Sequence, residues 1–122
     1  MLYISFAWTT QAFLAGGKIR TRRYWNDDYA EKFIRAYKRQ ETIGALDKLF
    51  RVGGRLIGKL ILTTEPHKEL TGLMNEFDYE TEGLLWIEGN GHLIKGKTPR
   101  KFFEDWKQKN DLLWVVDFKK IT

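Results

Sequence analysis

Residues 14–23 have the sequence LAGGKIRTRR, which indicates a tight turn between a helix and a strand. Glycine adopts the left-handed backbone conformation that ends many helices, so Gly16 and Gly17 predict the end of a short helix. Residues 19–23 are β-compatible and strongly basic, which favours a strand directly after the turn. Residues 2–6, ahead of the helix, alternate well enough for a first strand. We therefore expect a strand, a helix, a glycine turn and a second strand.

Three further helical regions follow from capping signals. Asn26 suits an N-cap, with two aspartates in the first turn, and apolar residues at helical spacing extend the prediction over residues 27–41. Residues 71–89 indicate short helical pieces broken at Gly83. Thr98, followed by a proline that suits the first helical position, predicts the start of the last helix.

The remaining segments indicate strands. Residues 46–62 contain two predicted strands that meet at paired glycines, and Gly58 inside the second one suggests a bulge. Residues 112–118 predict a closing strand buried on both faces. Short strands with inserted helices predict a single α+β domain over residues 1–122, built on a small, mostly antiparallel β-barrel.

Composition excludes several functional classes. The 122 residues include no cysteine and two histidines, so we expect neither a disulfide scaffold, nor a thiolate nucleophile, nor a metal site, nor a cofactor. His67 and His92 lie in turn-like contexts typical of surface histidines. Because no apolar run approaches the roughly 18 residues that span a bilayer, we expect a cytoplasmic protein with no membrane partner.

Charge is distributed unevenly along the chain. Residues 1–60 hold 12 Lys and Arg against 5 Asp and Glu, whereas residues 61–122 hold 9 against 11. A basic half with three arginines close together favours an anionic partner such as RNA. A solvated basic face is an equally good interpretation of the charge alone.

The glycine turn and its strand also carry a recognisable motif. A signature of the form Gly-x-Lys-x-x-(Glu or Thr)-x-Arg is met by Gly16, Lys18, Thr21 and Arg23. On these residues the chain resembles ASCH domains, a branch of the PUA-like superfamily. The opening strand and helix, the acidic run at residues 78–83 and the final strand occur in the expected order. The similarity covers most of the chain except the predicted helix over residues 27–41.

This resemblance implies a PUA-like barrel with a basic cleft that binds RNA. Some small bacterial members with threonine in the signature are acetylcytidine amidohydrolases, and in those a lysine accepts a proton, a threonine attacks and a glutamate donates a proton. By position these residues correspond to Lys18, Thr21 and Glu82. The extra helix is a departure from those hydrolases, and it lies close to the predicted site in sequence.

Elementary chemistry leaves the role of the lysine open. A threonine hydroxyl is a poor nucleophile and needs a neutral base within reach. Burial and neighbouring arginines would lower the pKa of Lys18, whereas Glu82 would raise it, so Lys18 is either a base or a cation for a phosphate. In a regular strand Thr21 and Arg23 share one face, so Lys18 can meet Thr21 only from the turn before the strand.

Two functions from different classes follow. In the first, a binding module holds RNA or a modified nucleoside through Arg20, Arg22 and Arg23, with Trp25 stacking on a base. Trp25 is the favoured aromatic because it follows the basic strand, whereas most other aromatics are needed in the core. In the second, a small amidohydrolase uses Lys18 and its two predicted partners on an acylated nucleoside. A basic face that binds an acidic protein remains a third interpretation.

Overall fold

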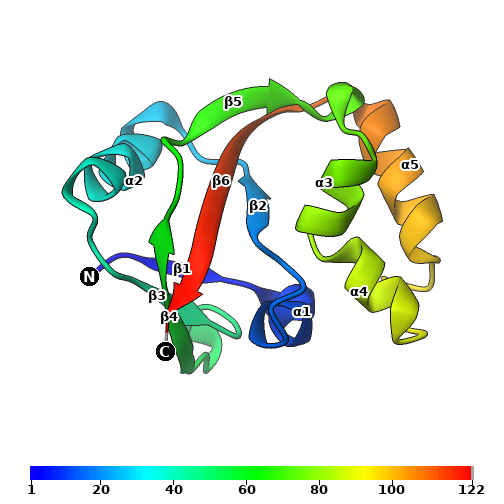
Figure 1. The fold of residues 1–122 in the computed structure, drawn as a ribbon, viewed down its shortest axis with the longest axis horizontal. Helices are drawn as coiled ribbons and strands as arrows, with labels where there is room; N and C mark the ends of the chain where they lie inside the picture. The colour runs from blue at the N-terminus through cyan, green and yellow to red at the C-terminus, as the bar shows by residue number, and fades with distance from the viewer. Residues whose placement is uncertain (122) are drawn as a thin grey trace.

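The structure, a computed structural model, describes residues 1–121. A six-stranded sheet occupies the centre of the molecule, and helices cover its flanks (Figure 1). The strands are β1 (Tyr3–Ser5), β2 (Arg20–Arg23), β3 (Ile43–Leu46), β4 (Leu56–Leu62), β5 (His67–Leu70) and β6 (Leu112–Ile121). Their order is β1-β3-β4-β6-β2, and β5 also pairs with β6. Only the β1–β3 pair is parallel among these strands.

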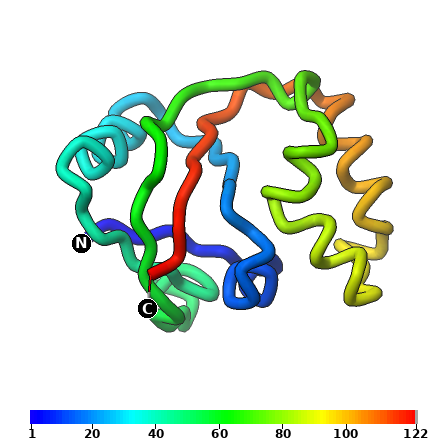
Figure 2. Tube along the Cα trace, in the orientation of Figure 1, coloured from blue at the N-terminus to red at the C-terminus, as the bar shows by residue number. Residues whose placement is uncertain are grey.

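The last strand, β6, organises the sheet. Its C-terminal part pairs with β4, from Phe118 opposite Leu62 to Ile121 opposite Lys59. Its N-terminal part pairs with both β2 and β5. Figure 2 shows this segment in red, running between the β2 and β4 segments. The predicted closing strand is therefore confirmed, and it extends to Ile121.

The α+β class is confirmed, whereas a closed barrel is not observed in residues 1–121. The sheet is open because its two end strands, β1 and β2, do not pair with each other. A side-chain hydrogen bond crosses the gap, in which Arg23 Nη2 donates to the Ser5 carbonyl at 2.7 Å. The bulge expected near Gly58 is present, since the register between β3 and β4 shifts there. The first of the two strands predicted in residues 46–62 is wrong, because β3 ends at Leu46 and residues 50–52 form a 3-10 turn before the paired glycines.

The helices begin and end where local signals predict. They are α1 (Thr10–Leu14), α2 (Asp27–Arg39), α3 (Glu76–Thr81), α4 (Leu84–Gly89) and α5 (Pro99–Lys109), with 3-10 turns η1 (Ala7–Thr9), η2 (Phe50–Val52) and η3 (Thr71–Leu73). Asn26 caps α2 by accepting from the backbone N–H of Tyr29, and Thr98 caps α5 in the same way. Within residues 1–121, no helix combines the length and apolar character needed to cross a bilayer.

Two buried clusters form the core. The larger one lies between the sheet, α1 and α2 and includes Phe6, Phe13 and Phe33. The smaller one lies among α3, α4 and α5 and includes Tyr79 and Phe103. Strand β2 is the end strand of the sheet that faces the α3–α5 helices (Figure 1), so its side chains lie where the two clusters meet.

Candidate functional site

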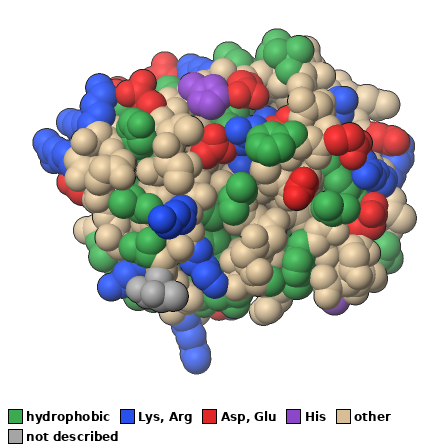
Figure 3. Space-filling model, viewed as in Figure 1, with side chains coloured by type: hydrophobic (Ala, Val, Ile, Leu, Met, Phe, Trp, Pro, Cys, Tyr) green, Lys and Arg blue, Asp and Glu red, His purple; other side chains and the backbone are tan. Residues whose placement is uncertain are grey.

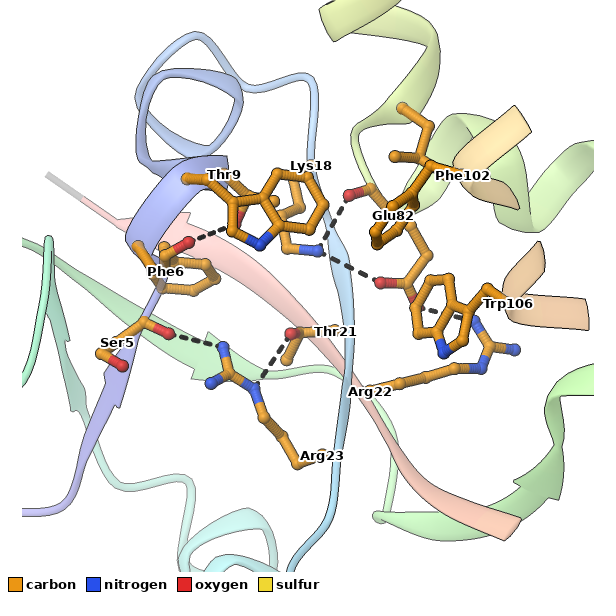
Figure 4. A pocket seen from close by; sticks show the side chains of 13 residues that line it. Ser5, Phe6, Thr9, Lys18, Thr21, Arg22, Arg23, Glu82, Phe102 and Trp106 are labelled. Atoms are coloured by element: carbon orange, nitrogen blue, oxygen red, sulfur yellow. Dashed lines mark hydrogen bonds and ion pairs between the residues drawn. The ribbon is translucent and has the colours of Figure 1, made fainter. Parts of the chain in front are cut away.

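A pocket of about 220 Å³ lies where the two clusters meet, on the open side of the sheet between β1 and β2. One wall comes from β1 and η1, another from β2, and a third from the α3–α4 junction and α5 (Figure 4). The lining residues are Ser5, Phe6, Ala7, Trp8, Thr9, Lys18, Thr21, Arg22, Arg23, Glu82, Leu84, Phe102 and Trp106.

Lys18 reaches this pocket from the turn before β2. The turn is tight because Gly16 has a φ of +77° and the Gly17 N–H donates to the Ala12 carbonyl at 2.8 Å. Regular pairing begins only at Arg20, so the irregular start that the sequence argument required is present. Lys18 Nζ points toward Glu82 (Figure 4) and donates to its carbonyl oxygen at 2.8 Å and to its Oε1 at 3.1 Å.

The Lys18 amine is almost completely removed from water, with 4% of the residue exposed. Burial lowers the pKa of Lys18 below its ordinary value of 10.5. The Glu82 carboxylate opposes this change, whereas the charges of Arg23 and Arg22 add to it. The net direction is downward, which increases the fraction of neutral amine near neutral pH.

Glu82 is placed by the junction between α3 and α4. It closes α3, and Gly83 follows with a φ of +93°, a conformation that favours glycine. A Cβ at position 83 would lie 3.0 Å from the Lys18 Cβ, so glycine also allows the chain to pass close to the lysine. Both carboxylate oxygens of Glu82 are occupied, Oε1 by Lys18 and Oε2 by Arg22 Nη1 at 2.6 Å.

Thr21 and Arg23 share one face of β2, as expected, and both line the pocket. Arg23 Nε donates to Thr21 Oγ at 3.1 Å, while its Nη2 donates to the Ser5 carbonyl oxygen. Among residues 1–121, no hydrogen bond joins Thr21 to Lys18, and no carboxylate forms an ion pair with Arg23. Burial lowers the pKa of Arg23 below its ordinary value. The nucleophile and base of the hydrolase hypothesis therefore share the pocket without being in direct contact.

The other two arginines of the basic ribbon are neutralised. Arg22, whose side chain is fully buried, forms ion pairs with Glu82, Asp78 and Glu69. Burial lowers the pKa of Arg22, but Glu82 and Asp78 outweigh it and hold the pKa above its ordinary value. Arg20 lies outside the pocket and pairs with Asp78 and Asp117.

This neutralisation changes the electrostatic picture drawn from the sequence. Of the four cations between residues 18 and 23, three contact carboxylates contributed by the acidic half of the chain. Sequence counts could not show this pairing, because the carboxylates come from positions about 50 to 100 residues away. The charge available to a polyanion at this pocket is much smaller than the sequence suggests.

The aromatic wall of the pocket differs from the expected one. Trp25 stacks on Phe33 at 4.0 Å between ring centroids, packs against the larger core cluster and does not line the pocket. The pocket is instead lined by Trp8, which is 47% exposed, together with Phe102 and Trp106. Trp8 meets Phe102 edge-on at 5.2 Å. The position of Trp8 directly after a strand was a usable signal, whereas the two α5 residues carried none.

Residues 1–121 contain no group of three or more His, Cys, Asp or Glu side chains placed to hold a metal ion. His67 is exposed and contacts Glu69.

Comparisons of the chain with models of protein families, with curated proteins and with solved structures gave no match. The function is therefore argued from the geometry of the pocket.

Proposed function

We propose that this chain is a small amidohydrolase that removes a short acyl group from the amine of a nucleobase, as in acetylcytidine. One observation carries the proposal: a buried lysine amine with a lowered pKa contacts a buried glutamate, in a pocket that also holds a threonine hydroxyl. Buried ionisable groups with shifted pKa values in a cleft are typical of catalytic sites. The PUA-like architecture belongs to the same proposal, supported by the signature residues that line the pocket.

The proton and bond changes are as follows. Thr21 Oγ attacks the acyl carbon, and its proton passes to the neutral amine of Lys18. The bond between the acyl carbon and the base nitrogen then breaks, and the nitrogen receives a proton from Lys18, directly or through the Glu82 carboxylate that Lys18 contacts. Water attacks the acyl-threonine next, which releases the carboxylic acid and restores the hydroxyl. The lysine stem supplies the movement that brings Nζ to Thr21, since such contacts often tighten only with substrate bound.

Arg23 is suited to the charge that develops in this reaction. Its Nε already contacts the attacking oxygen, and its Nη1 has no hydrogen-bond partner among residues 1–121. A fixed cation beside the nucleophile stabilises the negative oxygen of a tetrahedral intermediate. The absence of a carboxylate on Arg23 keeps its charge available for this role.

The dimensions of the pocket indicate a small substrate. Its 220 Å³ is below the roughly 300–1,000 Å³ of pockets for drug-sized ligands, which suits one base with a short acyl group. Trp8, Phe102 and Trp106 provide flat apolar surfaces for such a ring. A stretch of duplex RNA is far too large for this volume.

The proposal is tested by incubating purified protein with acetylcytidine and measuring release of acetate. We expect turnover by the wild type and by Thr63→Ala, which removes an exposed threonine outside the pocket. Thr21→Ala should reduce the rate by at least a hundredfold, because the nucleophile is lost, while Thr21→Ser retains part of it. Undiminished turnover in Thr21→Ala would show that another group attacks the substrate.

A second candidate is a binding module for RNA or a nucleoside. It is favoured by one observation, that Thr21 contacts Arg23 and not Lys18. Because Arg20 and Arg22 are bound to carboxylates, we expect any RNA affinity to fall only shallowly with salt, with a log–log slope of magnitude about 1 to 2. Fluorescence anisotropy with a single-stranded oligonucleotide at several salt concentrations measures this slope. A slope of about 4 or more would mean that the arginines leave their carboxylates to bind phosphates.

A further inference from the structure

The connection between β3 and β4 combines exposed apolar and basic side chains in one short loop. Residues 47–56 have the sequence DKLFRVGGRL, and we call them the amphipathic loop. Leu49, Phe50 and Val52 are 45%, 52% and 59% exposed, although water-exposed side chains of this size are unfavourable when clustered. Its cations are Lys48, Arg51 and Arg55, all exposed and without an ion pair among residues 1–121.

The backbone of the loop is held in a fixed shape. Asp47 Oδ1 accepts from the N–H groups of Lys48 and Arg55, both at 2.8 Å, which closes the base of the loop. The Gly54 N–H donates to the Leu49 carbonyl at 3.0 Å. A Cβ at Gly54 would lie 1.7 Å from the Lys48 carbonyl oxygen, so this tight closure requires glycine. A preformed loop loses little conformational entropy when it binds a partner.

The loop forms one end of the molecule. In Figure 1 it is the teal-green segment beyond the lower ends of β3 and β4, and Figure 3 shows basic side chains at the same end, one of them extending from the surface. Tyr3 and Leu56 extend its apolar part, since both are exposed and the Tyr3 ring meets Phe50 edge-on at 5.0 Å. Apolar side chains and cations are thus presented together on a protruding tip.

We propose that the amphipathic loop binds the surface of a membrane that contains anionic lipids. Leu49, Phe50 and Val52 would enter the region between headgroups and acyl chains, where apolar area is removed from water. The adjacent cations would remain at the level of the lipid phosphates and carboxylates, whose charge is complementary to theirs. This proposal is independent of the chemistry proposed for the pocket. The proposal departs from the expectation of no membrane partner, which followed from the lack of a segment long and apolar enough to span a bilayer.

The side chains favour a lipid surface over other partners. Single-stranded RNA binds by stacking its bases on aromatic rings. The loop has one aromatic ring, that of Phe50, and the Tyr3 ring already contacts it. Leu49 and Val52 offer no such stacking. A second copy of this chain on a two-fold axis would bring each loop cation near the cations of its partner, which is unfavourable.

Co-sedimentation with phosphatidylcholine vesicles, with and without about 30% phosphatidylglycerol, tests the proposal with the full chain. We expect the wild type to bind the anionic vesicles at least tenfold more tightly than the neutral ones. Lys48→Gln/Arg51→Gln should weaken this binding by about fivefold for each cation removed. The matched control is Lys38→Gln/Arg39→Gln, which removes two exposed cations from the end of α2 and should bind as the wild type does.

The apolar contribution is tested separately with Leu49→Ser/Val52→Ser, which leaves the Tyr3–Phe50 contact in place. We expect at least a tenfold loss of vesicle binding, with an unchanged circular dichroism spectrum as the check on folding. Equal loss in the loop and α2 charge variants would overturn the proposal, since net charge alone would explain it. No binding by the wild type would also overturn it, and anisotropy with a single-stranded oligonucleotide would then show whether the loop cations bind RNA instead.

Discussion

Lys18 is a lysine with 4% of its surface exposed, which is unusual for a charged side chain. A buried ammonium is costly, and here it is compensated by one carboxylate and one carbonyl of the same residue, Glu82. The surrounding charges of Arg22 and Arg23 make the protonated form less favourable still. This environment supports the proton transfer that we propose for Lys18.

A pH profile of the hydrolase reaction tests this role. Because burial lowers the pKa of Lys18, we expect kcat/KM to rise with pH and then to reach a plateau. The midpoint of the rise should lie below pH 10.5. Lys18→Arg keeps a positive charge that cannot be lost, so its residual activity should lack this rising limb. Acetate release measured from pH 6 to pH 10 gives both profiles. An identical limb in the two proteins would assign it to another group.

The lowered pKa of Lys18 also determines how the stability of the fold changes with pH. Between the lowered folded pKa of Lys18 and its unfolded value of 10.5, the unfolded chain binds more protons than the folded one. Stability contributed by this group therefore rises with pH through that window and is lost below it. At neutral pH the buried lysine therefore lowers the stability of the fold relative to its value above pH 10.5.

The residues of the pocket differ in how well the sequence predicts them. Lys18, Thr21 and Arg23 lie within six positions, so their common location follows from one local motif. Trp106 is brought to the pocket only by the packing of α5, which local sequence does not specify. Trp25 was expected there because it is close in sequence, yet its ring packs against Phe33.

Among the elements, the junction between α3 and α4 controls the position of Glu82. The chain turns from α3 into α4 within two residues because Gly83 adopts a left-handed conformation beside Lys18 and Ala12. Local signals predicted this break, since glycine has no steric barrier to a positive φ. The shape of this junction holds the carboxylate against the lysine.

Substitution at this junction should be costly. Gly83→Ala combines a positive φ with Cβ contacts of 3.0 Å and 3.1 Å, so we expect a loss of about 2 kcal/mol in the free energy of unfolding. Gly89→Ala is the control, because it is helical and has open space around it, and it should stabilise by about 0.5 to 1 kcal/mol. Urea denaturation followed by circular dichroism measures both values. Equal stability of the two variants would contradict the account of the junction.

Strand β5 shows the limit of prediction at this scale. Its sequence, His67-Lys68-Glu69-Leu70, has no apolar alternation and contains no β-branched residue, so no local pattern indicates a strand. The segment is extended because β6 offers it a free edge from Leu112 to Val115. Caps and glycine turns are local and were predicted, whereas this strand depends on a partner more than 40 residues away.

For the whole molecule, the decisive feature is the ionic network between the sheet and the α3–α5 helices. Asp78, in α3, accepts from Arg20 and Arg22, both in β2. Burial raises the pKa of Asp78, but hydrogen bonds from Arg22, the Asn75 N–H and Arg20 outweigh it and hold the pKa below its ordinary value of 3.8. The network joins the two core clusters at the wall of the pocket.

Removing this carboxylate charge should loosen the joint between the two clusters. We expect Asp78→Asn to cost about 3 kcal/mol in unfolding free energy, because it leaves the buried Arg22 short of a partner. Glu76→Gln, an exposed carboxylate in the same helix, should cause no measurable change. Since the stability from Asp78 is present above pH 3.8 and lost as pH falls through its folded pKa, the difference between wild type and Asp78→Asn should shrink below that pH. A constant difference down to pH 2 would contradict this assignment.

The expected closed barrel is not observed in residues 1–121. Closure would require β1 to pair with β2, and no local sequence pattern predicts whether two strands pair. The edges of β1 and β2 are separated by the pocket, and Arg23 spans the gap with a side chain in place of a backbone ladder. Periodicity predicts that a segment is a strand, but it does not predict which strand will be its neighbour.

The central position of β6 also has a consequence for biosynthesis. The ribosome makes residues 112–121 after all the segments that this strand must join, so β2 and β5 cannot enter the sheet until β6 has been made, although β1, β3 and β4 can already pair. Until then, the edges of β2, β4 and β5 lack a common template, and the apolar face of α2 has no finished surface to cover. Completion of the sheet is consequently a late, non-local event, and truncation before Leu112 should leave exposed strand edges that favour aggregation.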